Sequence, residues 1–224
     1  MPSVLVVDDQ FLIRSGITAL LTAAPGYEVV GEAEGGEEAV RLAAETCPDV
    51  ILMDIRMPGT DGIAATERIL AAHDPAGPAE QRPKVLVLTT FDSDEYVFRA
   101  LQAGASGFLL KDTPPDRLLA AIATVHAGEM LFSPRALRGL IDTYAAPVAA
   151  RASHPGLDTL TPREHEVLSL VGAGLSNADI AQRLVLSAAT VKTHVHRCMT
   201  KLALSSRAQA VVVAHEFGLA ARMP

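Results

Sequence analysis

The first 127 residues alternate short apolar runs with longer stretches in which apolar residues recur at helical spacing. Apolar runs without strict alternation are typical of strands buried on both faces. Runs separated by amphipathic helices favour a parallel sheet covered by helices on both sides. The pattern predicts strands near 3–8, 27–33, 49–53, 84–89 and 107–110, and helices near 11–23, 36–46, 62–73, 94–103 and 114–127.

The pattern changes after residue 127. Ser133-Pro134 is a helix start signal, and it predicts a short helix over 133–145. The stretch 145–158 mixes Ala, Pro, Gly and Ser without periodicity, which is typical of a linker. Four helical segments follow near 162–173, 176–183, 187–202 and 205–217. We therefore predict one domain over 1–127, a linker over 128–158 and a second domain over 159–224. The Pro-rich stretch 73–83 is predicted to be an exposed loop.

Charge divides the chain in the same way. Residues 1–132 carry 9 Lys and Arg against 20 Asp and Glu (net −11), residues 133–157 carry 3 against 1 (+2), and residues 158–224 carry 7 against 5 (+2). An acidic first domain disfavours nucleic acid as its partner, whereas the second domain has no such bias. The two domains are therefore expected to have different partners.

Two further features narrow the class of protein. The sequence has no apolar stretch near the ~20 residues of a membrane span and no basic-then-apolar leader, so we expect a cytoplasmic protein with no membrane partner. Cys47 and Cys198 lack a CxxC spacing, which favours small buried hydrophobic residues over a disulfide or metal site.

Five polar residues stand at the C-terminal ends of the apolar runs: Asp8, Asp9, Asp54, Thr89 and Lys111. In open α/β sheets this edge binds ligands. Carboxylates suit Mg²⁺, and an Asp can attack phosphorus to form an acyl phosphate. An ammonium and a hydroxyl suit phosphoryl oxygens. An Asp pair alone is common in turns, and a lone lysine is usually solvated. The combination at four strand ends favours one phosphoryl site, with Asp54 as the modified residue.

The motifs around these residues resemble the receiver domain of two-component response regulators over residues 3–127. The motifs are Val6-Val-Asp-Asp9, Met53-Asp-Ile-Arg-Met-Pro-Gly-Thr-Asp-Gly62, Leu88-Thr-Thr90 and Gly107-Phe-Leu-Leu-Lys111. The resemblance implies an α/β flavodoxin-like fold with a five-stranded parallel sheet in order 2-1-3-4-5. It also implies Asp54 as phosphoacceptor and a sensor histidine kinase as donor.

The same resemblance implies a set of supporting roles. Mg²⁺ (or Mn²⁺) would be held by Asp8, Asp9, Asp54 and the backbone carbonyl of Arg56. Thr89, Lys111 and Phe108 would sense the phosphoryl group. Phe108 lacks a hydroxyl, so a switch there would rest on packing, and an ordinary core phenylalanine is the open alternative. Bulky Arg56 and Phe91 would obstruct water, which predicts an acyl phosphate that persists for minutes or longer.

Residues 160–202 carry the start and stop signals of a helix-turn-helix. Thr161, Pro162 and Glu164 form a capping box with a proline at the first position, Gly174 ends this helix, and Ser176 and Ser187 start the next two. In the third helix, a predicted buried stripe contains Val191, Val195, Met199 and Leu202. The opposite face carries Lys192, Thr193, His196, Arg197 and Thr200. This face suits a major groove, although taken alone it could be an ordinary solvated surface.

These segments resemble the LuxR-type helix-turn-helix over about 159–218, and the whole chain is similar to the NarL/FixJ subfamily of response regulators. The resemblance implies an all-α four-helix DNA-binding domain. Lys192, Thr193 and His196 would face base edges, and Thr190, Arg197 and Lys201 would lie near phosphates. The fourth helix resembles the family's dimer-forming helix, with candidate contacts Val211, Val212 and His215, although packing within the monomer is the open alternative there.

The combined expectation is a DNA-binding response regulator controlled by phosphorylation of Asp54, which governs dimerisation. Its partners would be a sensor histidine kinase, promoter DNA, a second copy of itself and, as a further candidate, RNA polymerase. It would not be an enzyme beyond transferring a phosphoryl group to itself and losing it. A Mg²⁺-dependent phosphatase with Asp54 as its nucleophile would want a second acid at Asp-x-Asp spacing, and Arg56 stands at that position instead. The alternative is a LuxR-type regulator that works without phosphorylation.

Overall fold

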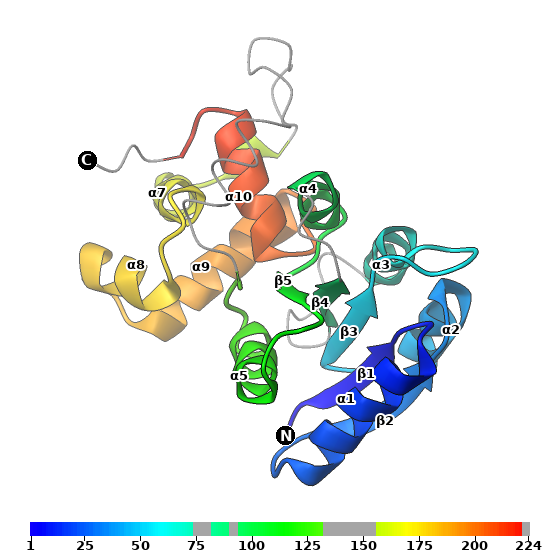
Figure 1. Ribbon diagram of the computed structural model, residues 1–224. Helices are drawn as coiled ribbons and strands as arrows, with labels where there is room; N and C mark the ends of the chain where they lie inside the picture. Colours follow the sequence, from blue (N-terminus) through cyan, green and yellow to red (C-terminus); the bar gives the residue numbers. More distant parts are fainter. Residues whose placement is uncertain (74–81, 90–93, 132–155, 221–224) are drawn as a thin grey trace. The chain divides into compact units, whose positions relative to one another are not determined.

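The computed structural model describes residues 1–73, 82–89, 94–131 and 156–220 (Figure 1). The chain divides into two compact units, Met1–Leu131 and Phe132–Pro224. The predicted helix at 133–145, most of the predicted loop at 73–83 and most of the linker lie outside the described residues, and so does Phe91. The predicted linker boundaries therefore stay a prediction.

The N-terminal unit is built on a five-stranded sheet in which all neighbouring strands are parallel. The strands are β1 (Ser3–Val7), β2 (Glu28–Ala33), β3 (Val50–Asp54), β4 (Lys84–Thr89) and β5 (Gly107–Leu110). Their order is β2-β1-β3-β4-β5, which confirms the predicted flavodoxin-like topology. The order reverses beside β1, so the C-terminal ends of β1 and β3 are neighbours at the switch point of the sheet.

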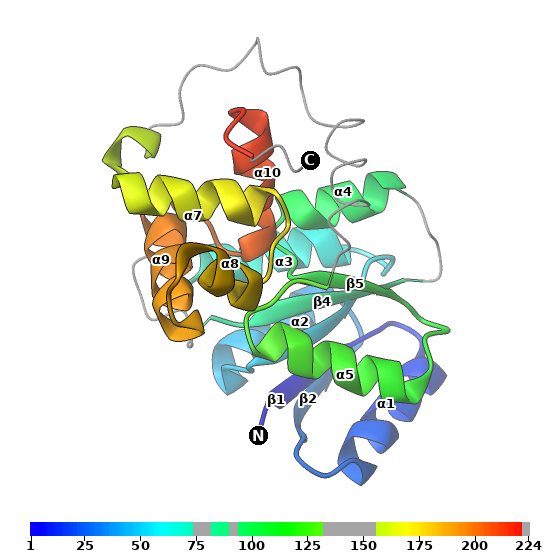
Figure 2. The ribbon, with the colours of Figure 1, turned by 90° about the vertical axis from the view of Figure 1, so that its left-hand side faces the viewer.

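Helices cover both faces of this sheet, as Figures 1 and 2 show. On one face lie α1 (Phe11–Ala23) and α5 (Pro115–His126), and on the other lie α2 (Gly36–Thr46), α3 (Gly62–Ala71) and α4 (Asp94–Gln102). Val4 and Val6 belong to the core under α1 and α5, whereas Leu5 and Val7 belong to the opposite core. Alternate side chains are thus buried on opposite faces, which explains the continuous apolar runs.

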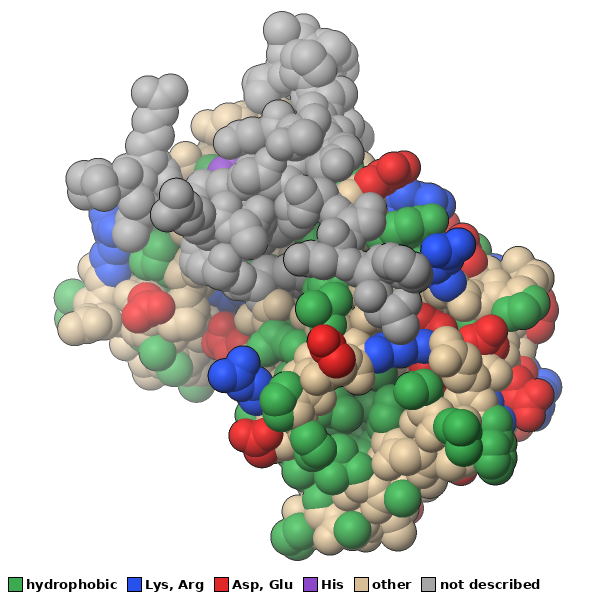
Figure 3. Space-filling view, in the orientation of Figure 1, with side chains coloured by type: hydrophobic (Ala, Val, Ile, Leu, Met, Phe, Trp, Pro, Cys, Tyr) green, Lys and Arg blue, Asp and Glu red, His purple; other side chains and the backbone are tan. Residues whose placement is uncertain are grey.

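Hydrophobic side chains are exposed on the surface of this unit, although the unit is strongly acidic. Figure 3 shows hydrophobic side chains that reach the surface over α1 and α5. Partly buried residues of these helices that pack against the core include Ile17, Leu20 and Leu119. At the start of α1, Phe11 and Leu12 are among the exposed large hydrophobic residues.

The C-terminal unit is helical, as predicted. It contains the 3-10 helix η3 (Leu157–Thr159), α7 (Pro162–Gly172), α8 (Asn177–Leu184), α9 (Ala188–Lys201) and α10 (Arg207–Glu216). The capping box of Thr161 and Glu164 is confirmed, and Ser176 and Asp179 form a second one. In the turn Leu157–Thr159, Thr159 Oγ1 donates to the Gly156 carbonyl at 2.7 Å.

Candidate functional site

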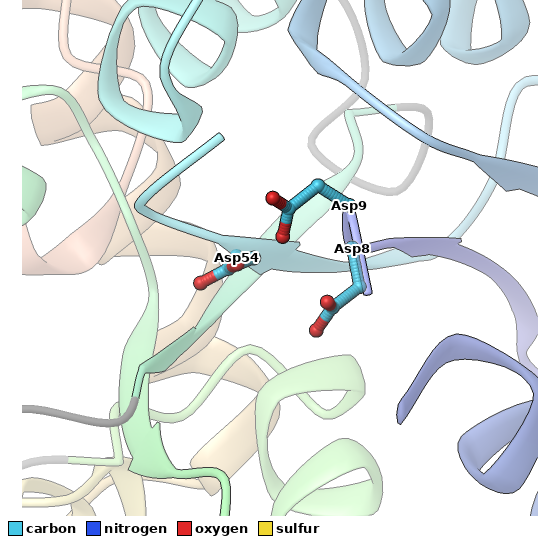
Figure 4. A group of neighbouring side chains, drawn as sticks. All are labelled: Asp8, Asp9 and Asp54. Carbon is cyan, nitrogen blue, oxygen red and sulfur yellow. The ribbon is translucent and has the colours of Figure 1, made fainter. Parts of the chain in front are cut away.

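Three carboxylates meet at the C-terminal edge of the sheet, where β1 and β3 end (Figure 4). One oxygen from each of Asp8, Asp9 and Asp54 can be chosen so that all lie within 4.8 Å of one another. Asp8 and Asp54 are buried, and Asp9 is the most accessible of the three. Hard carboxylate oxygens at this spacing fit Mg²⁺, which prefers oxygen ligands and keeps several waters.

Backbone amides fix two of these carboxylates. The Gln10 amide donates to Asp8 Oδ1 at 2.9 Å, and the Arg56 amide donates to Asp54 Oδ1 at 3.4 Å. Burial raises the pKa of Asp54 above its ordinary value, although hydrogen bonding to Lys111 works in the opposite direction. The site therefore holds a desolvated carboxylate that needs positive charge nearby.

Lys111 supplies that charge from the loop after β5. Its Nζ lies 2.7 Å from Asp8 Oδ2 and 2.8 Å from Asp54 Oδ2, and its side chain is only 5% exposed. Burial alone would lower the pKa of Lys111, but the hydrogen bonds to Asp54 and Asp8 outweigh it and raise the pKa above the ordinary value. The lysine predicted from its strand-end position therefore joins the two buried carboxylates.

Thr89 lies on β4 and Phe108 lies on β5, the two strands that follow β3 in the order of the sheet. Thr89 is buried at the end of β4, and its carbonyl accepts a hydrogen bond from the Lys111 amide at 2.8 Å. Phe108 is partly buried against the core that lies under α2, α3 and α4. This position suits both alternatives for Phe108, the packing switch and the ordinary core residue, so its role stays a prediction.

Arg14 is a site residue that sequence reasoning missed. Its guanidinium is buried, and Nη1 donates to the Asp8 carbonyl at 2.7 Å. The other contacts are Nη2 to Glu34 Oε1 at 3.1 Å and Nε to Glu32 Oε2 at 3.5 Å. Arg14 thus holds the backbone between β1 and α1, where Asp8 and Asp9 stand. The sequence feature that could have identified Arg14 is that it is the single charged residue in the apolar stretch Phe11–Ala23.

Gly62 allows the backbone to approach the predicted phosphoacceptor closely. A Cβ atom at Gly62 would lie 1.9 Å from the Asp54 carbonyl oxygen, inside the van der Waals contact of backbone atoms. The Gly62 amide donates to the Ile55 carbonyl at 2.9 Å, and Asp61 caps α3 by accepting from the Ala64 amide. Gly62 therefore holds the end of the segment that follows Asp54 against the strand. Any larger residue at this position would force the backbone to move.

Helix α9 presents the predicted DNA-reading face to solvent. Thr190, Lys192, Thr193 and Arg197 are exposed, and His196 is partly buried. The buried stripe contains Val191, Val195, Cys198 and Leu202, whereas Met199 is only partly buried. Cys198 replaces Met199 in the stripe because a step of seven residues returns to the same helix face, and a step of eight overshoots it.

Lys201 has structural partners of its own. Its Nζ lies 2.6 Å from Glu164 Oε2 and 2.9 Å from the Thr159 carbonyl. Glu164 is buried and also accepts from the Thr161 amide at 2.8 Å. Burial would raise the pKa of Glu164, but the hydrogen bonds from Lys201 and Thr161 outweigh it and lower that pKa. The predicted phosphate contact of Lys201 stays a prediction, and the structure adds an ion pair between α9 and α7.

The three dimer candidates on α10 are also engaged within the chain. Val211 and Val212 are buried, and His215 Nε2 lies 2.8 Å from the Gly172 carbonyl of α7. These contacts are what the packing alternative predicts for the helix. A dimer through these residues stays a prediction.

Comparisons with known proteins agree with this division of the chain. Residues 4–123 match the model of the response regulator receiver domain, and residues 158–214 match that of bacterial regulatory proteins of the luxR family. Among the described residues, no helix is both long and apolar enough to cross a membrane.

Individual relatives match nearly the whole chain. A transcriptional regulatory protein of Bacillus subtilis, LiaR, is 40% identical over 220 residues, which cover 96% of this chain and 97% of LiaR. The nitrate/nitrite response regulator NarL of Escherichia coli is 37% identical over 216 residues, covering 96% and 95%. Among solved structures, the response regulator ChrA of a heme-sensing two-component system has a TM-score of 0.50 and 33% identity, covering 97% of this chain and 98% of ChrA. The chain therefore belongs to the DNA-binding response regulators of two-component systems, with a receiver domain followed by a LuxR-type helix-turn-helix.

Proposed function

We propose that Asp54 is the phosphoacceptor of this response regulator and that its phosphorylation by a sensor histidine kinase controls DNA binding. The observation that carries the proposal is the arrangement around one buried carboxylate. Asp54 stands at the end of β3, Lys111 Nζ lies 2.8 Å from its Oδ2, and Asp8 and Asp9 complete a set of oxygens that fits Mg²⁺. Each of these groups has a role in moving a phosphoryl group onto Asp54.

The proposed reaction is a displacement at phosphorus. A carboxylate oxygen of Asp54 forms a bond to phosphorus while the bond to the donor, a phosphohistidine nitrogen or the acyl oxygen of acetyl phosphate, breaks. The electron pair leaves with the donor group. Mg²⁺, held by Asp8, Asp9, Asp54 and the Arg56 carbonyl, would offset the repulsion between the carboxylate and the incoming phosphoryl oxygens.

Two side chains would then bind the phosphoryl group on Asp54. The Lys111 ammonium, which already contacts Asp54, would bind a phosphoryl oxygen as a point charge. The Thr89 hydroxyl, one strand away, would donate to another oxygen, with Phe108 packing behind it. Both would change partners only after Asp54 is modified, which makes them a switch rather than a catalytic pair.

Helix α9 would be the part of the regulator that contacts DNA. Lys192, Thr193 and His196 would contact base edges, and Thr190, Arg197 and Lys201 would lie near phosphates. Phosphorylation would bias a two-state receiver domain, and a coupling of about 1–3 kcal/mol would then favour dimerisation, with α10 as the candidate surface. Dimers read paired half-sites, so the coupling would raise operator occupancy.

The test is phosphorylation of the full chain by acetyl phosphate with Mg²⁺, followed by intact mass and by binding to promoter DNA. We expect one phosphoryl adduct on the wild type when Mg²⁺ is present, none when Mg²⁺ is omitted from the reaction, and none on Asp54→Asn. Asp112→Asn, which removes an exposed carboxylate beside Lys111, is the matched control and should keep the adduct.

The outcomes separate the candidate functions. An adduct that persists for minutes and strengthens DNA binding supports the proposal. An unmodified chain that binds the same DNA equally well with and without acetyl phosphate would indicate a regulator that works without phosphorylation. An adduct that survives in Asp54→Asn would move the phosphoacceptor to another residue.

A further inference from the structure

Thr193 is an exposed residue of α9 whose hydroxyl is already used inside the helix. Its Oγ1 donates a hydrogen bond to the Ala189 carbonyl at a distance of 3.0 Å. Ala189 is itself exposed, one turn earlier on the same face. A threonine bonded in this way places its hydroxyl against the preceding turn of the helix.

The group that Thr193 retains for an outside contact is therefore its γ-methyl. Residues four apart on a helix are neighbours, so Thr193 and Ala189 share one exposed face of α9. Together they form a small apolar surface next to Lys192, which is exposed and carries a cation. In the major groove, the matching apolar feature is the C5-methyl of thymine, since the other base edges present donors and acceptors.

We propose that Thr193, with Ala189, is a specificity-determining residue that recognises the C5-methyl group of a thymine in each half-site. The contact is van der Waals packing of methyl on methyl and does not use the threonine hydroxyl. The ligand class is a pyrimidine with a 5-methyl group in double-stranded DNA. The inference rests on the proposed role of α9 as the base-reading helix.

A rival contact uses the same residue. The Thr193 oxygen keeps lone pairs while its hydrogen is donated to Ala189, so it could accept from the amino group of adenine or cytosine. Two substitutions separate these contacts. Thr193→Val keeps both the shape and the γ-methyl and removes the hydroxyl, whereas Thr193→Ser keeps the hydroxyl and removes the γ-methyl.

The experiment uses the full chain, incubated with acetyl phosphate and Mg²⁺, and the duplex that the wild type then selects most strongly from a randomised pool. Each thymine of that duplex is replaced in turn by uracil, which removes only the 5-methyl group. We expect one uracil per half-site to weaken wild-type binding about fourfold, the loss from ~0.8 kcal/mol for one buried methyl. Thr193→Val should show the same loss, and Thr193→Ser, which keeps only the Ala189 methyl, should lose most of the difference between the thymine and uracil duplexes.

Three results would overturn the inference. One is a wild type that is indifferent to every uracil. Another is Thr193→Ser with the full uracil effect, because another residue then reads the methyl. The third is Thr193→Val losing its base preference while Thr193→Ser keeps it, because the hydroxyl is then the reading group. A wild type that selects no sequence at all would contradict the proposed function itself, and this outcome is distinct from the other three.

Discussion

Replacing Lys201 by Met tests whether this residue stabilises the C-terminal unit or only contacts DNA. Methionine keeps most of the length and the apolar stem, and it removes the ammonium. Glu164 would then lose its ion pair at 2.6 Å and keep the Thr161 amide, while its side chain remains 4% exposed. The Thr159 carbonyl would lose a donor at 2.9 Å. The variant therefore leaves a nearly buried carboxylate without its cation.

The expected cost follows from how exposed the two partners are. Removing one partner of a buried ion pair costs about 3–5 kcal/mol, and exposed pairs contribute about 0–1 kcal/mol. The Lys201 side chain is 33% exposed, so water screens the pair in part. We therefore expect Lys201→Met to lower the free energy of unfolding of this unit by about 2–3 kcal/mol at neutral pH.

The stability difference between Lys201→Met and the wild type should also change with pH in a defined direction. The pKa of Glu164 is lowered in the folded wild type, so its contribution to stability is present above the unfolded pKa and is lost as the pH falls through the lowered value. Without Lys201, burial dominates and moves the pKa of Glu164 upward. The difference in stability between variant and wild type should therefore be largest at neutral pH and shrink in acid, as Glu164 takes up a proton.

Hydrogen exchange with mass spectrometry on the full chain reports each unit separately. The amides of α7 and α9 should lose protection by about 30- to 150-fold in Lys201→Met, while those of β3 stay unchanged. Arg197→Met removes an exposed cation from the same helix and is the matched control. It should change stability by less than about 0.5 kcal/mol and reduce the salt slope of DNA binding by about one. If Lys201→Met behaves like this control in both assays, the ion pair contributes nothing measurable and Lys201 is a phosphate contact.

Three further predictions follow from the geometry. Gly62→Ala should destabilise the receiver domain by about 2–3 kcal/mol in chemical denaturation and should slow phosphorylation, because the new Cβ meets the Asp54 carbonyl. Gly16→Ala is the control: its Cβ would have no atom within 4 Å, so it should stabilise the domain by about 0.5–1 kcal/mol. Val185→Gly should stabilise the C-terminal unit by about 0.5–1 kcal/mol in hydrogen exchange, because Val185 adopts φ +54° while 90% exposed; a loss of stability would contradict this. Mg²⁺ at 100 times its dissociation constant should stabilise the receiver domain by about 2.7 kcal/mol in thermal unfolding, and Asp9→Asn should abolish most of this gain; an equal gain in the variant would place the ion elsewhere.

The fold and the clustering of Asp8, Asp54 and Lys111 could be predicted because each depends on signals in the local sequence. A strand end is marked by the change from apolar to polar residues, and parallel strands bring their C-terminal ends to one edge. Asp54 and Lys111 were therefore placed together although 57 residues separate them. The short chain segments that cap the helices were predicted for the same reason, since a cap involves residues only three apart.

What sequence reasoning missed depends on which distant residues the fold brings together. Arg14 is a single cation in an apolar helix, and its partners Glu32 and Glu34 come from β2 and the residue after it. The family resemblance places Lys201 near DNA phosphates, and it gave no sign of the ion pair with Glu164, which lies 37 residues earlier in the chain. A cation carries the same local signal whether it contacts a phosphate or a buried carboxylate, so local sequence does not reveal such an ion pair.

Residues 156–159 contact the last turn of α9. Lys201 Nζ donates to the Thr159 carbonyl, and a Cβ at Gly156 would lie 2.5 Å from the Lys201 carbonyl oxygen. A displacement of residues 156–159 must therefore either break these contacts or move the end of α9, because close-packed groups have no room to shift separately. Lys201→Met should consequently raise hydrogen exchange at Thr159 and Leu160 together with that of α9. Unchanged exchange at those two residues would show that the chain entering this unit is held by other contacts.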